Sequence, residues 1–374
     1  MLRILSVCTV PTDKSGIPNV IFNLLSNFPK DSVKLGYVAI NDPSDFYKQR
    51  LRDIGAELYI VPRKIQHPLR YIRQLALIAH NYDVIHVHGN SATMVLEMIA
   101  AKLGGVKIRI AHSHSTTCNM KVIDFLARPI FHTICNGRLA CGVKAGKWLF
   151  GNREFKVINN GISTDKFTFS NEKRVAIRKQ LNLPLDTSPS NKFPMILIGH
   201  IGNFVEAKNH QFLIRIFKEY NNYNPNSKLL LLGSGPLMNE VKNSVDNHGL
   251  TDSVVFVGSV DNPQDYMNAM DIIAMPSLYE GLPLTLIEEQ ANGLPIVAAD
   301  TITSDANITG NLSYCPISEG DIKTWKKMIE EGLRSQISRG ERSRKSVIQI
   351  QESGYDVSSA ARSLLDYYRM FINE

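Results

Sequence analysis

Two glutamates, Glu280 and Glu288, stand eight residues apart on either side of a predicted helix start. A helix that begins near Pro283 or Leu284 presents its free backbone amides, and the positive end of its dipole, to whatever Glu280 holds. Both carboxylates can then face one ligand and accept hydrogen bonds from its alcohols. The spacing indicates a site for an anion that carries hydroxyl groups. The alternative is a surface helix with an acidic start.

A second candidate loop contains Gly202, Asn203 and Lys208, between an expected strand and a helix marked by Phe212. Gly202 permits close approach of backbone to ligand, and Lys208 at the helix entry can neutralise a phosphate. This pattern is typical of a diphosphate cradle, although a loop glycine with a solvated lysine explains it about as well. A nucleoside diphosphate sugar offers both the phosphates and the hydroxyls. The nearby glycines Gly233 and Gly235 are a weaker sign of a nucleotide-facing turn, and a tight connection explains them slightly better.

Four histidines form two pairs, His86-x-His88 and His112-x-His114, and each pair places two imidazoles on one face of an expected strand. This spacing can bind metal, but no carboxylate or thiolate is near either pair in sequence, so metal is the weaker interpretation. A structural, hydrogen-bonded role is an equal alternative for each histidine. We select His114 as the functional candidate because it is the last before the strand ends.

Composition fits a soluble globular protein of two domains: 374 residues, 44% hydrophobic and 21% charged. The first residues are too short an apolar run for a signal peptide, and no stretch is long enough to span a bilayer. The five cysteines are odd in number and lack a CxxC pair, which argues against a disulfide framework or thiolate zinc site. We therefore expect a cytoplasmic protein.

Charge is divided unevenly along the chain. Residues 1–170 contain 22 Lys and Arg against 11 Asp and Glu, a formal charge of +11, whereas the remainder has 20 against 24, or −4. The basic residues are scattered without a nucleic-acid-binding module, so an anionic membrane surface or a phospholipid-linked substrate is favoured over nucleic acid. A merely solvated basic surface is the alternative. The stretch 69–79 can rest on a membrane, but packing against the first sheet explains it better.

Short apolar runs alternate with helical stretches throughout, which predicts two doubly wound α/β domains of Rossmann type that face a central cleft. The expected domains are 1–165 and 194–355, with a Pro- and Ser-rich linker region at 166–193 and a terminal segment at 356–374. The expected strands are Ile4–Val10, Leu35–Ile40, Leu58–Val61, Asp83–Val87, Lys107–Ala111, Met195–Gly199, Lys228–Leu232, Val254–Gly258, Asp271–Met275 and Pro295–Ala299.

Together these residues resemble glycosyltransferase family 4, retaining enzymes with the GT-B fold. The Glu280–Glu288 pair is similar to the family's E-x7-E signature, and the flanking segments 266–277 and 293–297 fit its pattern. Segment 157–167 resembles the family's domain crossover. The tract 109–115 and the segment 300–303 further resemble members that build bacterial capsular polysaccharides and exopolysaccharides.

The resemblance implies roles for these positions. Glu288 would hold the ribose hydroxyls and Glu280 the donor sugar. Lys208 would stabilise the departing diphosphate, and His114 would touch the donor sugar near the reacting centre. The remaining donor-binding positions are glycines and backbone amides: Gly16, Gly202, Asn203, Gly281, Leu282 and Leu284. No divalent metal, cofactor or protein nucleophile is required, domain 1–165 would bind the acceptor, domain 194–355 the nucleotide sugar, and segment 356–374 would form a helix that returns to the first domain.

This chain departs from the family at two positions. Asn203 stands where the family usually has Arg, and the loss of a charge-assisted partner for a diphosphate costs about 1.5–3 kcal/mol, roughly tenfold to a hundredfold in affinity or rate. Ser15 precedes Gly16 where paired glycines are common. Asn203 therefore leaves open whether the enzyme is slow, compensated elsewhere or inactive.

We expect a retaining glycosyltransferase that moves a sugar from a nucleotide donor, most plausibly a UDP-sugar, to a lipid-linked glycan at the inner membrane face. Two alternatives remain. One is a non-catalytic sugar-nucleotide-binding partner subunit, which Asn203 motivates. The other is a nucleotide-sugar epimerase on the same fold.

Overall fold

The computed structural model describes residues 1–12, 16–184, 194–280, 282–334 and 337–372. The chain forms two compact units: residues 1–161 together with 354–374, and residues 162–353. The expected domain at 1–165 and terminal segment at 356–374 correspond in position to the first unit. Residues 171–180 of the expected linker region form helix α8 (Asn171–Gln180) of the second unit.

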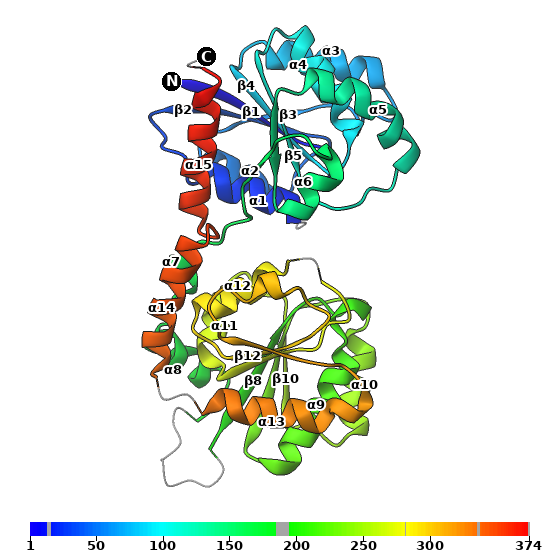
Figure 1. Cartoon of the computed structure of the whole chain (residues 1–374). Helices are drawn as coiled ribbons and strands as arrows, with labels where there is room; N and C mark the ends of the chain where they lie inside the picture. The colour runs from blue at the N-terminus through cyan, green and yellow to red at the C-terminus, as the bar shows by residue number, and fades with distance from the viewer. Residues whose placement is uncertain (13–15, 185–193, 281, 335–336, 373–374) are drawn as a thin grey trace. The chain divides into compact units, whose positions relative to one another are not determined.

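The first unit is built on a parallel seven-stranded sheet with the order β3-β2-β1-β4-β5-β6-β7 (Figure 1). Its central strands β1, β4 and β5 are buried along most of their length because both faces of the sheet are covered, as parallel sheets require. The strands are β1 (Leu2–Cys8), β2 (Val33–Ala39), β3 (Glu57–Ile60), β4 (Val84–Gly89), β5 (Ile108–Ser113), β6 (Gly137–Ala140) and β7 (Lys156–Val157).

Helices cover both faces of this sheet. One face packs on α1 (Gly16–Leu25), α2 (Asp45–Asp53) and α15 (Val357–Met370). The other packs on α3 (Pro68–Ala79), the short 3-10 helix η1 (Ala92–Met94), α4 (Val95–Leu103), α5 (Lys121–Ile134) and α6 (Val143–Phe150).

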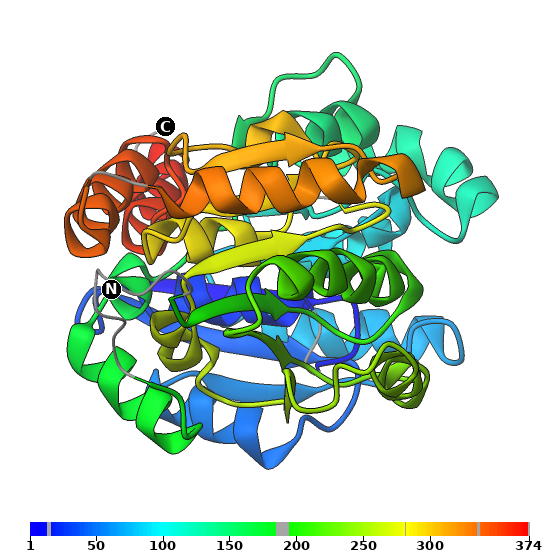
Figure 2. The ribbon, with the colours of Figure 1, turned by 90° about the horizontal axis from the view of Figure 1, so that it is seen from below.

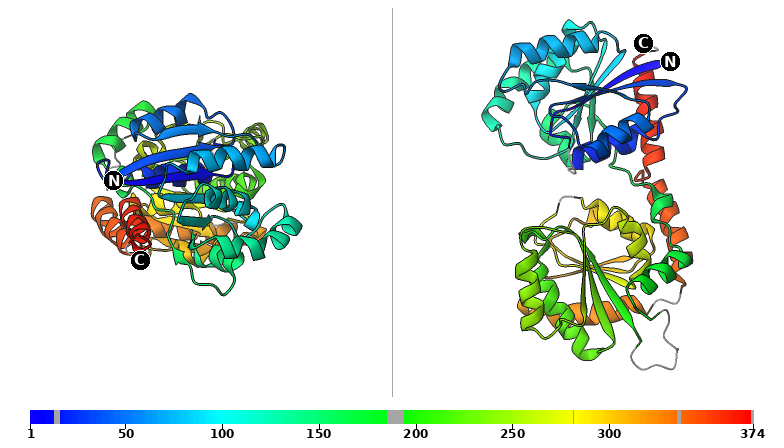
Figure 3. Two further views of the ribbon diagram at one scale, coloured as in Figure 1. Left: turned by 90° about the horizontal axis from the view of Figure 1, so that it is seen from above. Right: turned by 180° about the vertical axis from the view of Figure 1, so that it is seen from behind.

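Helix α15 is the last element of the chain and belongs to the first unit (Figure 3, right panel). It begins at Asp356, whose carboxylate accepts a hydrogen bond from the Ser359 amide at 3.0 Å, a standard N-cap. Apolar residues at helical spacing, including Leu364 and Tyr368, are buried against the sheet and α1. Residues from the end of the chain therefore form part of the core of the first unit.

The second unit repeats the design with a parallel six-stranded sheet in the order β10-β9-β8-β11-β12-β13. From β8 the chain first adds strands on one side of the sheet, β9 and β10, and then on the other side, from β11 to β13. Ligands of such sheets bind at the switch point between β8 and β11, beyond the carboxyl ends of the strands. The strands are β8 (Ile196–Ile201), β9 (Ser227–Leu232), β10 (Val254–Gly258), β11 (Ile272–Met275), β12 (Ile296–Ala299) and β13 (Leu312–Cys315).

Its helices also form two layers. One layer contains α9 (His210–Tyr223), α10 (Met238–Asn247) and α13 (Ile322–Leu333), of which α9 and α13 lie over the sheet in Figure 2. The other contains α8, α11 (Pro263–Ala269) and α12 (Leu284–Ala291). The helices α7 (Thr164–Phe167) and α14 (Arg339–Glu352) contact α12. Three 3-10 turns complete the unit: η2 (Glu206–Lys208), η3 (Ser304–Ala306) and η4 (Glu319–Asp321).

All ten expected strands are present, with ends that shift by a few residues, which confirms the two-sheet α/β prediction. The expectation missed β6, β7 and β13. Strand β7 has only two residues, and Arg138 in β6 and Ser313 in β13 interrupt the apolar residues of those strands, so none of the three shows an apolar run. Among the described residues, no helix is both long and apolar enough to cross a bilayer.

Candidate functional site

Helix α12 begins at Leu284, directly after Pro283, which confirms the predicted helix start. Proline stands at the N-cap position, and the first amides of a helix have no partner within the helix. Leu284 therefore offers a free-amide position at the positive end of the helix dipole, with Leu282 two residues earlier in the chain. Gly281 lies outside the described residues.

Glu280 and Lys208 form an ion pair, with the Lys208 Nζ 2.5 Å from the Glu280 Oε1. The Ser277 hydroxyl donates to the same carboxylate oxygen at 3.1 Å. The two loops are also tied through backbone, because the amide of Leu278 donates to the carbonyl of Ala207 at 2.8 Å. Each charged side chain is 16% exposed, so this pair is largely buried but still reaches solvent. Two residues that lie 72 positions apart in sequence thus form one ion pair.

A hollow of about 340 Å³ opens beside Lys208, at the carboxyl ends of β8 and β9. Lys208 supplies the cationic group among its lining residues, and Thr285 belongs to the first turn of α12. The lining residues are Ile201, Gly202, Asn203, Lys208, Leu232, Gly233, Ser259, Val260, Pro263 and Thr285. Gly202, Asn203 and Lys208 are therefore brought together, as the loop pattern predicted.

Two glycines keep this hollow open. Gly233 has φ +134°, a conformation reserved for glycine, and a Cβ there would overlap the carbonyl oxygen of Gly202. At Gly202 a Cβ would press on the Lys208 side chain at 3.1 Å and on the Nε2 of His200 at 3.2 Å. The sequence interpretation slightly favoured a purely structural role for Gly233. The structure places it in the wall of the hollow.

Glu288 lies one turn into α12, and burial raises the pKa of its carboxyl to about 7. Its neighbour Glu289 is fully buried, with neither carboxylate oxygen hydrogen-bonded. Burial, followed by the charge of Glu288, raises the pKa of Glu289 well above its usual range. Sequence analysis did not single out Glu289. Its position beside Glu288 was visible, but its burial came only from the orientation of α12.

A buried histidine pair beneath the Lys208 loop was also missed. His200, on β8, donates from Nδ1 to the carbonyl of Ala274 at 2.9 Å, while its Nε2 lacks a hydrogen bond. His210 stands at the start of α9 with its ring centroid 4.8 Å from that of His200. Burial lowers the pKa of both, so both are neutral near pH 7. Uncharged His200 is the group directly under Gly202.

The remaining predicted residues, Gly16 and His114, belong to the first unit. Gly16 is the exposed first residue of α1, and a Cβ there would meet no neighbour. His114 follows the end of β5, and its Nε2 lies 3.0 Å from the Nδ1 of His88. Burial lowers the pKa of His114 to about 3, so this imidazole is neutral. The tertiary structure therefore joins the two histidine pairs that the sequence separates.

Two Rossmann-like units, one with a charged hollow at the switch point of its sheet, define the GT-B class of glycosyltransferases. Two family models agree with this class: "Glycosyltransferase Family 4" matches residues 14–166, and "Glycosyl transferases group 1" matches residues 196–334. Between them these models span most of the chain. The chain is therefore a glycosyltransferase that carries a family 4 domain followed by a group 1 domain.

Proteins with similar sequences align with different fractions of this chain. A Bacillus subtilis protein named as the glycosyltransferase EpsF is 28% identical, over 96% of this chain and 94% of its own length. An Escherichia coli UDP-Gal:alpha-D-GlcNAc-diphosphoundecaprenol alpha-1,3-galactosyltransferase is 29% identical over 62% of this chain and 59% of its own. The capsular polysaccharide biosynthesis glycosyltransferase CapM of Staphylococcus aureus is 28% identical, over 59% and 55%.

Solved structures show the same fold. Anabaena HepE in complex with UDP has a TM-score of 0.76 and 17% identity, covering 99% of this chain and 100% of that one. The sucrose-phosphate synthase of Thermosynechococcus elongatus has a TM-score of 0.72 and 16% identity, with all of both chains covered. At these identities the likeness concerns the fold alone.

Proposed function

We propose that this protein is a retaining glycosyltransferase that uses a nucleotide-sugar donor, UDP-linked, to extend a lipid-linked glycan in bacterial polysaccharide biosynthesis. The observation that carries the proposal is the Lys208–Glu280 ion pair beside the hollow under α12. A cation, free helix amides and an acidic group for hydroxyls are the groups that a sugar diphosphate requires.

In this proposal the diphosphate lies against Lys208 and the first amides of α12. Glu280 accepts hydrogen bonds from the sugar, and its pairing with Lys208 holds the lysine in place before the donor arrives. Glu288 accepts from the two ribose hydroxyls in its ionised form. Gly202 and Gly233 let the backbone approach the nucleotide, while Asn203 offers an uncharged amide where a second cation is usual.

The proposed transfer reaction requires no nucleophile from the protein. The bond from the anomeric carbon to the diphosphate oxygen breaks, and the acceptor oxygen bonds to that carbon on the same face. The departing phosphate takes the acceptor's proton. Lys208 and the helix dipole stabilise the negative charge that develops on the leaving group. His114, neutral because of its burial, would contact the transferred sugar, and Gly16 would let the α1 loop approach the donor.

Names of relatives support this choice of substrates. HepE has been solved with UDP-glucose as well as with UDP, and the E. coli relative is named for a UDP-galactose donor and a diphosphoundecaprenol-linked acceptor. EpsF covers nearly the whole chain, and CapM is named for capsular polysaccharide biosynthesis. These names favour a UDP-sugar and a lipid-linked glycan for this protein too.

Helix α5 gives a physical reason for a lipid-linked acceptor. Its inner side is fixed by buried Phe131 and by Asp124, which accepts from the Ala92 amide at 2.7 Å. Its outer side carries large apolar side chains that are 54–73% exposed: Val122, Ile123, Phe125, Leu126 and Ile130. Such an apolar stripe on the basic half of the chain fits contact with an anionic bilayer. We propose peripheral attachment through α5.

The first experiment measures thermal stability of the purified protein with UDP-, GDP- and ADP-sugars, without added metal, and repeats it with Glu288→Gln. A ligand at about 100 times its Kd adds roughly 2.7 kcal/mol, a shift of a few degrees. A UDP-sugar shift that Glu288→Gln abolishes supports the donor site. Transfer of that sugar to a lipid-linked glycan then tests the activity, and a retained anomeric configuration tests the stereochemistry.

Other outcomes would favour other functions. Donor binding with no transfer, even after Asn203→Arg, would indicate a sugar-nucleotide-binding partner subunit. Conversion of the donor's sugar without any acceptor would indicate an epimerase. No stabilisation by any nucleotide sugar would overturn the donor site itself.

Attachment is tested separately by sedimentation with vesicles of phosphatidylglycerol or phosphatidylcholine. We expect binding to the anionic vesicles that the double variant Phe125→Ser, Leu126→Ser loses. Ile348→Ser is the matched control, because Ile348 is an exposed apolar residue, 54% accessible, in the second unit. Equal loss in the control, or no vesicle binding by the native protein, would contradict the assignment to α5.

A further inference from the structure

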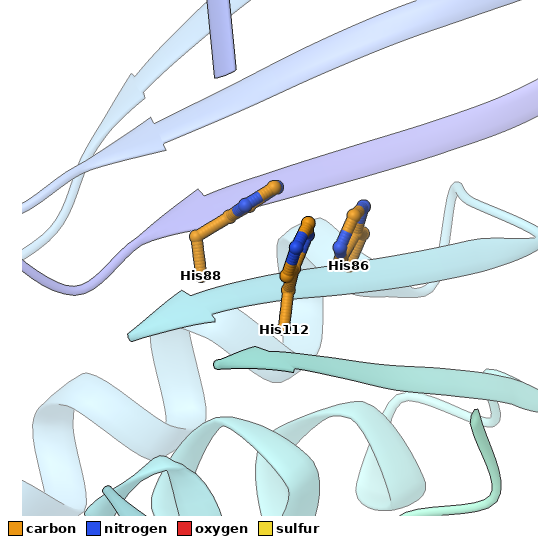
Figure 4. A group of neighbouring side chains, drawn as sticks. All are labelled: His86, His88 and His112. Atoms are coloured by element: carbon orange, nitrogen blue, oxygen red, sulfur yellow. The ribbon is translucent and has the colours of Figure 1, made fainter. Parts of the chain in front are cut away.

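Three imidazoles converge inside the first unit, whereas the proposed donor hollow belongs to the second. His86 and His88 alternate along β4, so they share one face of the sheet. His112 stands on β5 directly opposite His88 in the strand register. One ring nitrogen from each of the three histidines lies within 4.8 Å of the other two (Figure 4). Two adjacent strands therefore aim three histidines into one small volume.

These imidazoles are buried yet lack enough hydrogen-bond partners. His86, His88 and His112 are at most 1% exposed. The Nε2 of His86 and both ring nitrogens of His112 have no hydrogen bond in the structure. Buried polar nitrogens normally find a partner, since leaving one unpaired costs about 1–3 kcal/mol. These unpaired nitrogens indicate that the cluster binds a ligand that is not part of the protein chain.

In His86 and His88 the Nδ1 atom contacts a neighbouring side chain, which leaves the Nε2 atom of each ring for a metal ion. The hydroxyl of Tyr368, on α15, lies 2.6 Å from the Nδ1 of His86. The Nε2 of His114 lies 3.0 Å from the Nδ1 of His88. Metal-binding histidines characteristically use their second nitrogen in this way, because the outer contact sets ring orientation and tautomer. Burial also keeps His86 and His88 neutral by lowering their pKa values, and neutral imidazole is the form that binds metal.

We infer that His86, His88 and His112 bind one divalent transition-metal ion of the zinc class. Three imidazoles suit zinc and its neighbours, whereas calcium and magnesium prefer oxygen. Zinc sites with three histidines and a fourth oxygen ligand are a known type. The hydroxyl of Ser6, which is buried, unpaired and opposite His86 in the register of β1, is a candidate for the fourth position, as is a water molecule.

Binding requires the cluster to contract and its rings to turn, because the His86 and His112 rings lie nearly parallel, at 4°, with centroids 5.2 Å apart. Ligand atoms of a tetrahedral zinc ion, with bonds of about 2.0–2.1 Å, lie roughly 3.3–3.4 Å apart. The imidazoles would therefore draw together from separations of up to 4.8 Å, by rotation of the side chains. The bound ion would join β4 to β5 and, through Tyr368, to α15. It would also hold His88, the partner of His114, in one orientation.

This inference goes beyond the proposed transfer reaction and does not depend on it. The test uses untagged protein, so that no added histidines bind metal. Elemental analysis should find close to one equivalent of zinc per chain after purification without chelator. Because the site is buried, protein is also unfolded in guanidinium with chelator, then refolded with ZnCl2 or CoCl2. We expect refolding with cobalt to produce the visible absorption of a low-symmetry, protein-bound ion.

Three variants separate this site from the other histidines. His112→Asn should lose the metal and the cobalt spectrum. Tyr368→Phe, which keeps the ring and removes only the hydroxyl, should weaken zinc affinity about 10–100-fold, and it decides the question if His112→Asn does not fold. His67→Asn, at an exposed position, should behave as the native protein.

The inference is overturned if native protein holds less than about a tenth of an equivalent by both routes. It is also overturned if Tyr368→Phe and His67→Asn bind zinc equally well. Neither result bears on the donor site, because nucleotide-sugar binding is measured in a separate experiment without metal.

Discussion

Glu288 is the residue at which we expect pH to control donor binding. Its pKa is raised by burial from 4.5 to about 7, so the folded protein is more stable with this carboxyl protonated. That contribution is complete below pH 4.5 and is lost as pH rises through about 7. Ribose hydroxyls favour the opposite, ionised state, because only the carboxylate offers both oxygens as acceptors.

Donor affinity should therefore increase about tenfold between pH 6 and pH 8, since the ionised fraction of a group with pKa 7 rises by that factor. Calorimetric titration with a UDP-sugar measures this, because its diphosphate does not titrate in the range. Glu288→Gln should bind more weakly and show no slope. A slope that persists in the variant would assign the titration to another group.

Asn203 is the second residue-scale determinant. It is exposed and lines the donor hollow beside Lys208. Asn203→Arg adds a charge-assisted partner for the diphosphate and should improve donor affinity or transfer rate by about tenfold to a hundredfold. Asn203→Gln, which lengthens the side chain without charge, is the control. A measured kcat/KM that Arg leaves unchanged would mean that this position does not face the diphosphate.

At the scale of elements, Gly233, in the loop after β9, leaves room for the hollow beside Lys208, which we propose binds the donor. Gly233→Ala combines a backbone conformation that only glycine adopts with overlap on Gly202, so we expect a loss of stability of more than about 2 kcal/mol and of donor binding. Gly249→Ala is the matched control. Gly249 also has positive φ, +65°, but a Cβ there meets no atom within 4 Å.

The control should therefore cost only about 1–2 kcal/mol and leave donor affinity unchanged. Denaturant unfolding gives both stabilities, and calorimetry gives the affinities. If the two variants lose equal stability and Gly233→Ala still binds the donor, the close approach of the two backbone segments is not needed for the site.

At the scale of the whole molecule, each unit has its own core, and the first depends on the last helix of the chain. Leu364 is buried on α15, and Leu213 is its counterpart on α9 of the second unit. Leu→Ala at either position should cost about 2–5 kcal/mol. The damage should stay within one unit, because each leucine belongs to a separate core cluster.

Hydrogen exchange read by mass spectrometry tests this. Leu364→Ala should speed exchange in β1 and β4, although they lie more than 270 residues away in sequence, and leave β8 and β9 protected. Leu213→Ala should do the reverse. Faster exchange throughout the chain in both variants would show that the two units unfold together.

Sequence alone determined the class of fold, and it supplied the residues on which the proposed donor site rests. Buried parallel strands are continuous apolar runs, so ten of them could be read directly, and the start of α12 followed from Pro283. The resemblance to a family at Glu280, Glu288 and Lys208 could also be seen in the sequence, because it rests on residue types and spacings within short stretches. The strands β6, β7 and β13 were missed because β7 has only two residues, and Arg138 and Ser313 interrupt the apolar residues of β6 and β13.

Only the tertiary structure decided which distant groups meet. Pairing of Lys208 with Glu280 depends on how two loops end at one edge of a sheet, and the burial of Glu289 depends on which side of α12 faces the core. The two histidine pairs looked unsuited to metal because no acidic or thiol ligand was near in sequence. The register of β4 on β5 places His88 opposite His112, and α15 adds Tyr368 to His86. Strand register and helix docking are long-range properties, so no local pattern contains them.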